Sequence, residues 1–158
     1  RSRLVIKTVV SAGGRRAWLA ETPEQARAVL LREAPNEPAL VQAYEPAIVD
    51  SGEYSAIFLA GELSHAVLKL PQRGEFRVQE HFGGRTEAVQ GARWMAEYGR
   101  RVLDELPEVP GYARVDFVVD AAGEPKLMEL ELIEPDLFLR YAPESYSRLA
   151  DLLLRSRT

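Results

Sequence analysis

The sequence predicts an α+β protein built on antiparallel sheets, and three observations lead to this prediction. Apolar runs of strand length, rich in β-branched residues, recur along the 158-residue chain. Short turns that contain glycine separate several of these runs, which favours antiparallel neighbours. Fewer helical patterns interrupt them, in the order β-β-α-β followed by β-β-β-α-β-β-α. The acidic stretch VDSGE divides the chain into expected lobes of residues 1–50 and 51–158.

The first lobe is predicted to begin with a pair of strands. The run LVIKTVV, residues 4–10, is typical of a strand, the Gly-rich SAGG turns the chain, and RRAWLA returns. A helix follows, because Thr22 stands as N-cap, Pro23 occupies the first helical position and Gln25 completes a capping box. PNEP ends this helix, and ALVQAY supplies the last strand of the lobe.

The second lobe is predicted to hold more strands than helices. EYSAIFLAGELSHAVLKLP indicates two strands joined at Gly61, and EFRVQEH indicates a third strand that ends at Gly83 and Gly84. The longest helix is expected over residues 86–106, because apolar residues recur there at helical spacing. This stripe consists of Met95, Tyr98, Val102 and Leu106. A hairpin within residues 114–135 follows, and apolar residues near the C-terminus indicate a final helix.

Composition and charge exclude several classes of protein. The 24 acidic residues outnumber the 20 Lys and Arg and are interspersed with them, which argues against nucleic acid as the main partner. Without cysteine, the chain has no thiol nucleophile, disulfide or thiolate zinc site. No apolar run approaches the roughly 20 residues of a membrane span, and no signal peptide is visible, so a cytoplasmic protein is the default expectation. Because a strand begins almost at Arg1, we expect the C-terminal part of a longer protein.

Three carboxylates converge in the predicted hairpin RVDFVVDAAGEPKLMELELIEP. A two-residue loop at Ala122 and Gly123, or a four-residue loop around them, places Asp116 opposite Glu129, with Glu131 on the same face. Like charges directly across a sheet destabilise it by a few tenths to about 1 kcal/mol. Bound Mg²⁺, which prefers carboxylate oxygens, would remove that repulsion. A solvated acidic strand face is the alternative.

The N-terminal strand and turn suggest a second site. In VIKTVVSAGG, Lys7 precedes Gly13 and Gly14, and a point charge beside bare backbone N–H groups suits a phosphate. The G-x-x-x-x-G-K-[ST] order of a P-loop is absent. A plain hairpin turn is the alternative interpretation.

These motifs stand in the order found in the ATP-grasp ligases, and the chain from Val5 to about Leu139 resembles the C-terminal part of that superfamily. VIKTVVSAGG resembles its Lys-bearing strand and the Gly-rich flap over the nucleotide phosphates. VQAYEPAI resembles the segment that joins the two lobes and pairs with adenine, and RGEFRVQEHFGG resembles an Arg-x-Asn segment. RVDFVV and MELELIEP resemble the two magnesium-binding strands. Glutathione synthetase-like and D-cycloserine cyclo-ligase-like enzymes share this pattern.

The resemblance implies a ligase that depends on ATP and Mg²⁺. It implies one or two bound Mg²⁺ ions, which Mn²⁺ could replace. Such an enzyme converts a carboxylate to an acyl phosphate and joins it to an amine of a small amino-acid or peptide-like substrate. Arg77 is implied as the catalytic residue near the transferred phosphoryl group, and the implied metal ligands are Asp116, Glu129 and Glu131. The residues implied to contact ATP are Lys7, Gly13, Gly14, Gln42, Tyr44, Ile48, Glu53, Lys69 and Met128.

Several positions depart from the family pattern. Glu131 and Gln79 stand where the family has Asn, Lys69 stands where relatives have Arg, and Ser55 replaces an Arg of glutathione synthetase. These departures argue against glutathione and leave open a nucleotide-binding module without catalysis, or a purely structural domain. The expected partners are ATP, a carboxylate, an amine and the N-terminal domain of the same protein, with a homodimer as a further alternative.

Overall fold

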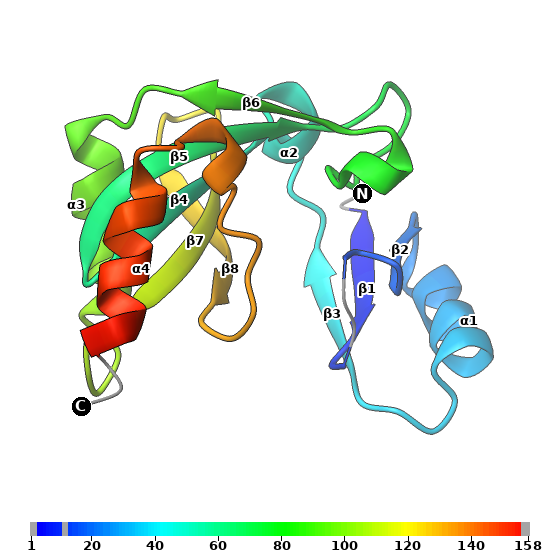
Figure 1. Ribbon diagram of the computed structural model, residues 1–158. Coiled ribbons are helices and arrows are strands. Elements are labelled where there is room, and N and C mark those ends of the chain that lie inside the picture. Colours follow the sequence, from blue (N-terminus) through cyan, green and yellow to red (C-terminus); the bar gives the residue numbers. More distant parts are fainter. Residues whose placement is uncertain (1–2, 11–12, 156–158) are drawn as a thin grey trace. The chain divides into compact units, whose positions relative to one another are not determined.

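The computed structural model describes residues 3–10 and 13–155, and the chain divides into two compact units (Figure 1). The first unit comprises residues 1–46 and the second comprises residues 47–158. Each unit has its own sheet and its own hydrophobic core. Among the described residues, no helix has the length and the apolar character that crossing a membrane requires.

The first unit packs one helix on a three-stranded antiparallel sheet. The strands are β1 (Leu4–Thr8), β2 (Ala17–Ala20) and β3 (Ala39–Ala43), in the order β2-β1-β3. Helix α1 (Pro23–Glu33) begins as predicted, because Thr22 Oγ1 accepts a hydrogen bond from the Gln25 amide at 3.3 Å. The Gln25 side chain in turn accepts from the Glu21 amide. Ile6 of β1 and Val29 of α1 meet in the core.

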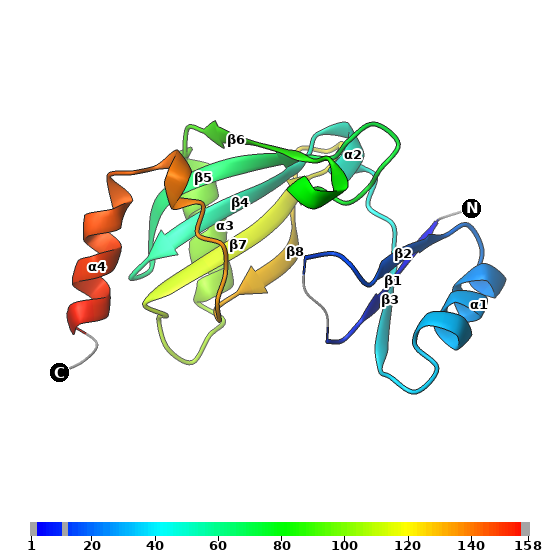
Figure 2. The same cartoon turned by 45° about the vertical axis from the view of Figure 1, so that its right-hand side comes forward.

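The second unit contains a five-stranded antiparallel sheet in the order β6-β5-β4-β7-β8. Its strands are β4 (Glu53–Leu59), β5 (Glu62–Leu70), β6 (Arg85–Val89), β7 (Tyr112–Val119) and β8 (Pro125–Glu131). Its helices are α2 (Ala47–Asp50), α3 (Arg93–Leu103) and α4 (Ser145–Arg155), with 3-10 turns at Glu80–Phe82 and Leu139–Tyr141. Figure 2 shows α3 behind the sheet and the segment that leads into α4 in front of it.

The main core of the second unit lies between α3 and the sheet. Met95, Gly99 and Leu103 are buried four residues apart, so they form one stripe along α3. Phe58, Val115 and other residues of β4 and β7 complete this core. Because side chains alternate along a strand, the residues between them point to the opposite face. That opposite face carries a smaller apolar cluster, made of Ile57, Val67 and Phe138, and the charged residues described below.

Two predictions about residues 75–106 are wrong. The strand expected over EFRVQEH does not form, and residues 75–79 run without a strand partner before the turn at Glu80–Phe82. The helix expected over residues 86–106 covers only Arg93–Leu103, because residues 85–89 form the edge strand β6. Pairing with β5 satisfies the backbone of β6, which outweighs the helix propensity of its Glu and Ala residues. The predicted stripe still packs in the core: Met95, Tyr98, Val102 and Leu106.

The β7–β8 hairpin has the predicted acid pairing but a different turn. Val119 pairs with Pro125, so the loop has five residues instead of two or four. The Asp120 carboxylate closes this loop by accepting two backbone N–H groups. Beyond it the register shifts by one residue at a β-bulge, which leaves Met128 unpaired and sets Asp116 opposite Glu129. The odd loop and the bulge therefore offset each other.

Candidate functional site

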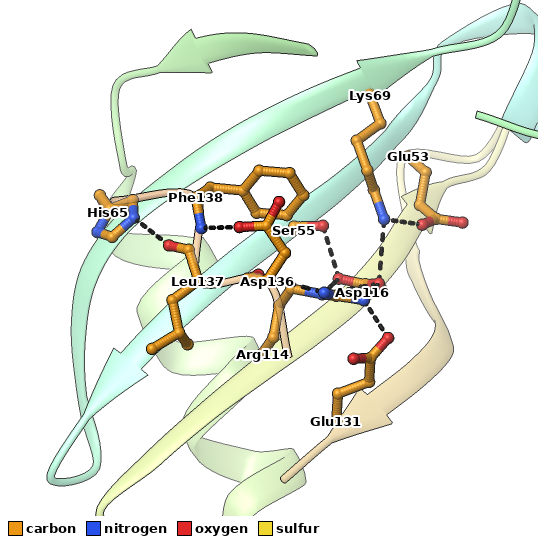
Figure 3. Close-up of polar contacts among 10 residues, drawn as sticks. All are labelled: Glu53, Ser55, His65, Lys69, Arg114, Asp116, Glu131, Asp136, Leu137 and Phe138. Carbon is orange, nitrogen blue, oxygen red and sulfur yellow. Dashed lines mark hydrogen bonds and ion pairs between the residues drawn. The ribbon is translucent and has the colours of Figure 1, made fainter. Parts of the chain in front are cut away.

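The three acids that were predicted to bind metal do come together, on the sheet face away from α3. Figure 3 shows two of them, Asp116 and Glu131, with their neighbours. Asp116 of β7 and Glu129 and Glu131 of β8 each offer a carboxylate oxygen, and these atoms lie within 4.8 Å of one another. Asp116 is only 1% exposed, whereas Glu131 is half-buried and Glu129 is exposed. The cluster thus opens from a buried carboxylate towards solvent, and its hard oxygen donors suit a divalent cation.

Asp116 is surrounded by donors from the neighbouring strands. Ser55 Oγ of β4 donates to Oδ1 at 2.6 Å, and Lys69 Nζ of β5 donates to Oδ2 at 3.0 Å. Arg114 Nε donates to Oδ1 at 2.9 Å from two residues along the same strand. Burial acts to raise the pKa of Asp116, but Lys69 and Arg114 outweigh it and hold this pKa below its usual range. Asp116 is therefore a fixed, ionised carboxylate.

Lys69 connects Asp116 to a second buried acid, Glu53. Glu53 and Lys69 face each other across β4 and β5, and their side chains form an ion pair. Burial acts to lower the pKa of Lys69, yet the attraction of Glu53 and Asp116 raises it above its usual value. Lys69 therefore stays charged. The two predicted nucleotide contacts Glu53 and Lys69 lie in the same charged network as the acids.

Arg114 is a site residue that the sequence reasoning missed. Its Nη2 donates to Asp116 Oδ2 at 3.0 Å and also forms an ion pair with Glu131. Its Nη1 donates to the backbone carbonyl of Asp136 at 3.2 Å. The predicted register contained a signal for this role, because Arg114 lies two residues before Asp116 and directly opposite Glu131.

The network carries more negative than positive charge. Its members are the carboxylates Glu53, Asp116, Glu129 and Glu131 and the cations Lys69 and Arg114. With every group counted as ionised, four acids against two cations give a formal charge of −2, which is the charge that one divalent cation would offset. Burial raises the pKa of Glu53. Burial raises the pKa of Glu131, and repulsion by the neighbouring carboxylates adds to this effect.

Arg77, the predicted catalytic residue, lies outside this network. Its Nε and Nη2 bind the Glu75 carboxylate at 3.0 and 2.6 Å, and its guanidinium lies 3.6 Å from the centre of the Phe82 ring. Within the described residues, its contacts are with Glu75, Phe76 and Phe82 and not with the acids of β7 and β8. The hydrogen bonds from Arg77 lower the pKa of Glu75 to about 2.

In the first unit, two predicted nucleotide contacts share one face of the sheet. Ile6 of β1 packs on the helix side, so the neighbouring Lys7 and Val5 point to the opposite side. Val5 pairs with Gln42 of β3, which places Gln42 on the same side as Lys7. Lys7 and Gln42 therefore both lie on the face that α1 leaves open.

The remaining predicted contacts are spread over both units. Gly13 and Gly14 have positive φ angles of 61° and 67°, and residues 11 and 12 of the expected flap lie outside the described residues. Tyr44 follows β3, and its amide donates to the carbonyl of residue 3. Ile48 is buried on the short helix α2, and Met128 is the bulged residue of β8.

Comparison with known proteins supports the assignment of the fold. No family model matches the chain. The cycloserine biosynthesis protein DcsG of Streptomyces lavendulae is 32% identical over 124 residues, which cover 72% of this chain and 40% of the relative. The chain thus spans less than half the length of this curated relative.

Three solved structures show the same architecture. D-cycloserine synthetase DcsG matches with a TM-score of 0.85 and 24% identity, over 99% of this chain and 56% of that one. The D-alanine–D-alanine ligase of Bacillus anthracis, complexed with ATP, matches with a TM-score of 0.67 and 18% identity, over 97% and 51%. The ATP-grasp ligase PsnB, complexed with Mg and ADP, matches with a TM-score of 0.63 and 16% identity, over 96% and 46%. The predicted α+β fold is confirmed, and the chain has the fold of these ATP-grasp structures.

Proposed function

We propose that the chain forms the nucleotide- and magnesium-binding part of an ATP-dependent carboxylate–amine ligase. The observation that carries this proposal is the cluster of Asp116, Glu129 and Glu131, whose oxygens lie within 4.8 Å of one another on an ATP-grasp fold. The network has four acids and two cations, a formal charge of −2 when every group is ionised. A divalent cation matches both the donor atoms and the charge.

The residues present fit Mg²⁺, and Asp116, Glu129 and Glu131 would hold it. The bound ion would offset the charge on the phosphate oxygens of ATP. The protein fixes the orientation of one metal ligand, because Ser55, Lys69 and Arg114 all donate hydrogen bonds to the Asp116 carboxylate. Such outer partners set the geometry and affinity of a metal site.

The proposed reaction has two steps. A carboxylate oxygen of the substrate attacks the γ-phosphorus of ATP, and the bond between that phosphorus and the β–γ bridging oxygen breaks, releasing ADP and giving an acyl phosphate. The amine nitrogen then attacks the acyl carbon, the bond to the phosphate oxygen breaks, and the nitrogen loses its proton to a base. Phosphoryl transfer needs mainly positioning and charge neutralisation, which the charged network of the second unit would provide.

The names of similar proteins support an amino-acid or peptide-like substrate. They include a cycloserine biosynthesis protein, a D-alanine–D-alanine ligase and a ligase complexed with a minimal precursor. The chain covers about half or less of each of these proteins, so the activity of the whole protein is part of the proposal.

A nucleotide-binding module without catalysis is the second candidate, and the contacts of Arg77 favour it. The Arg77 guanidinium is already paired with Glu75 and lies over the ring of Phe82. For Arg77 to stabilise a transferred phosphoryl group, it would have to exchange the Glu75 carboxylate for phosphate oxygens. A module that only binds nucleotide requires no such exchange.

Calorimetric titration with Mg²⁺ and ADP tests the metal assignment. Glu129→Gln is the informative variant, because Glu129 is the exposed member of the cluster. The substitution removes one carboxylate ligand and leaves the buried ion pairs of Asp116 intact. We expect it to lower the affinity for Mg²⁺·ADP at least about tenfold, which corresponds to about 1.4 kcal/mol. Glu124→Gln, an exposed acid in the turn of the same hairpin, is the matched control and should bind as the wild type does.

Phosphate release separates the two candidates. The full-length protein is incubated with ATP, Mg²⁺ and a panel of amino acids that offer carboxylates and amines. Release that depends on both substrates supports the ligase. Nucleotide binding without release for any member of the panel supports the module, and the absence of Mg²⁺·ADP binding by a folded chain contradicts both.

A further inference from the structure

His65 of β5 lies on the same sheet face as the acids but belongs to a separate polar network (Figure 3). A β-bulge creates this network: Ile57 pairs with His65 and Phe58 pairs with Leu63, so Ser64 is the extra residue. The bulge brings Ser64 Oγ to 3.0 Å from His65 Nδ1. Ser64 Oγ also lies 2.8 Å from Oγ of the buried Ser145 at the start of α4.

The direction of these hydrogen bonds follows from the partner of Nε2. His65 Nε2 lies 2.9 Å from the Leu137 carbonyl oxygen, which can only accept, so Nε2 carries a hydrogen. In the neutral ring Nδ1 must then accept from the Ser64 hydroxyl, and Ser64 Oγ can accept from Ser145. The network therefore fixes the ring, and the ring holds the backbone at Leu137.

Leu137 stands between two residues that contact Arg114. The Asp136 carbonyl accepts from Arg114 Nη1 at 3.2 Å, and the Phe138 ring centre lies 5.6 Å from the guanidinium carbon. Phe138 has a φ of 51°, a left-handed conformation that is unfavourable for a bulky residue and persists only when surrounding contacts enforce it. The hydrogen bond from His65 is one such contact, and it comes from the sheet itself.

We propose that His65 is a positioning residue for Arg114. By holding Leu137, His65 keeps the Asp136 carbonyl and the Phe138 ring against the guanidinium, whose other N–H groups then meet Asp116 and Glu131. When the bond to Leu137 is lost, residues 136–138 can relax, and Arg114 loses a fixed backbone acceptor. The expected effect on nucleotide binding rests on the function proposed above, whereas the effect on Arg114 does not.

The position of Arg114 can be followed by NMR in the 158-residue chain. The Arg114 Nε–H donates to both oxygens of the buried Asp116, at 2.9 and 3.2 Å, so its signal should exchange slowly with water. Loss of the signal in Arg114→Lys assigns it. In His65→Leu we expect exchange at least about tenfold faster, because opening of the local structure becomes easier. His81→Leu, the same replacement at an exposed histidine, should leave the exchange rate unchanged.

Two polar variants test the individual hydrogen bond. His65→Gln can place an N–H group near the position of Nε2, so it should largely restore slow exchange of the Arg114 signal. His65→Asn has a shorter side chain, which can contact Ser64 but cannot reach Leu137, so it should behave like His65→Leu. The pair of amide variants still decides the question if His65→Leu fails to fold.

Titration with Mg²⁺·ADP supplies the second measurement. His65→Leu and His65→Asn should bind about 10- to 100-fold more weakly than the wild type, as is typical when an outer partner of a metal site is removed. An Arg114 signal that stays protected in folded His65→Asn overturns the proposal. If the wild type does not bind Mg²⁺·ADP but the exchange rates change as stated, the function proposed above fails and the positioning role stands.

Discussion

At the scale of single residues, Asp116 links the stability of the fold to the proposed metal site. It is 1% exposed and accepts hydrogen bonds from Ser55, Lys69 and Arg114. A hydrogen bond to a buried charged group contributes about 1.5 to 3 kcal/mol. Lys69 and Arg114 also pair with Glu53 and Glu131, so each cation keeps one acidic partner when the charge of Asp116 is removed.

Asp116→Asn weakens the hydrogen bonds from Ser55, Lys69 and Arg114, so it should lower the free energy of unfolding by about 1.5 to 3 kcal/mol even without metal. Glu129→Gln should change it by less than about 0.5 kcal/mol, because Glu129 is exposed. Urea denaturation in the presence of EDTA measures both values. Equal effects of the two substitutions would contradict the charge network described for Asp116.

Glu75 gives a prediction for pH. The hydrogen bonds from Arg77 lower the pKa of Glu75 from 4.5 to about 2. A carboxyl group with a lowered pKa stabilises the fold fully above its unfolded-state pKa, and this stabilisation is lost as the pH falls through the folded-state pKa. The stability difference between wild type and Glu75→Gln should thus be constant above about pH 5 and shrink towards pH 2. Urea midpoints across this range test it, with exposed Glu108→Gln as the control; a difference independent of pH would refute it.

At the scale of the elements, sequence patterns predicted the strands that bury one face and the helices with clear periodicity. They failed at β6, where pairing with β5 decides the structure. They also failed at residues 75–79, which have no strand partner and are placed by tertiary contacts. Val78 is 2% exposed, and a Cβ at Gly84 would lie 2.1 Å from the Val78 carbonyl oxygen. Neither contact leaves a periodic signal in the sequence.

The bulges explain why the candidate site was only partly predicted. Alternation along the strands places Asp116, Glu129 and Glu131 on one face, and the pairing of Arg114 with Glu131 follows from the same register. A bulge depends on both strands of a pair, so the extra residue Met128 could not be read from one of them. The ion pair in which Lys69 offsets the charge of Asp116 likewise depends on the order of β5, β4 and β7 in the sheet, which a single strand sequence does not reveal.

Helix α3 gives the prediction that belongs to this scale. Replacing glycine with alanine inside an exposed helix stabilises it by up to about 1 kcal/mol. At Gly99, however, a Cβ would lie 2.2 Å from the Phe58 ring, so Gly99→Ala should destabilise the second unit by about 1 to 3 kcal/mol. Gly111→Ala, where a Cβ meets nothing within 4 Å, should be close to neutral. Thermal denaturation distinguishes the two, and equal melting temperatures would contradict the packing of α3.

At the scale of the whole molecule, the apolar clusters described for the first unit share no residue with those described for the second. Ile6 belongs to the core of the first unit and Ile57 to a cluster of the second, and both are 0% exposed. The order of strands and helices predicted the fold class, because each unit repeats a simple antiparallel pattern. The identical burial of two isoleucines in separate cores offers a matched experiment.

Ile6→Ala and Ile57→Ala should each cost about 2 to 5 kcal/mol, the usual range for this substitution in a core. Amide hydrogen exchange should locate the loss. Ile6→Ala is expected to reduce protection mainly in β1, β2, β3 and α1, and Ile57→Ala mainly in β4, β5 and β7. A uniform loss along the chain in both variants would show that the cores unfold as one cooperative unit.

The five-residue loop of the β7–β8 hairpin and the bulge of β8 together determine which residue of β8 lies opposite Asp116. Asp116 is also aligned from its other side, opposite Ser55 of β4, so its alignment does not depend on residues 120–124. Glu129 and Glu131 lack this second alignment, because β8 is the edge strand of the sheet. A change of one residue in the loop would therefore have to be matched by a change at the bulge for Glu129 to stay opposite Asp116.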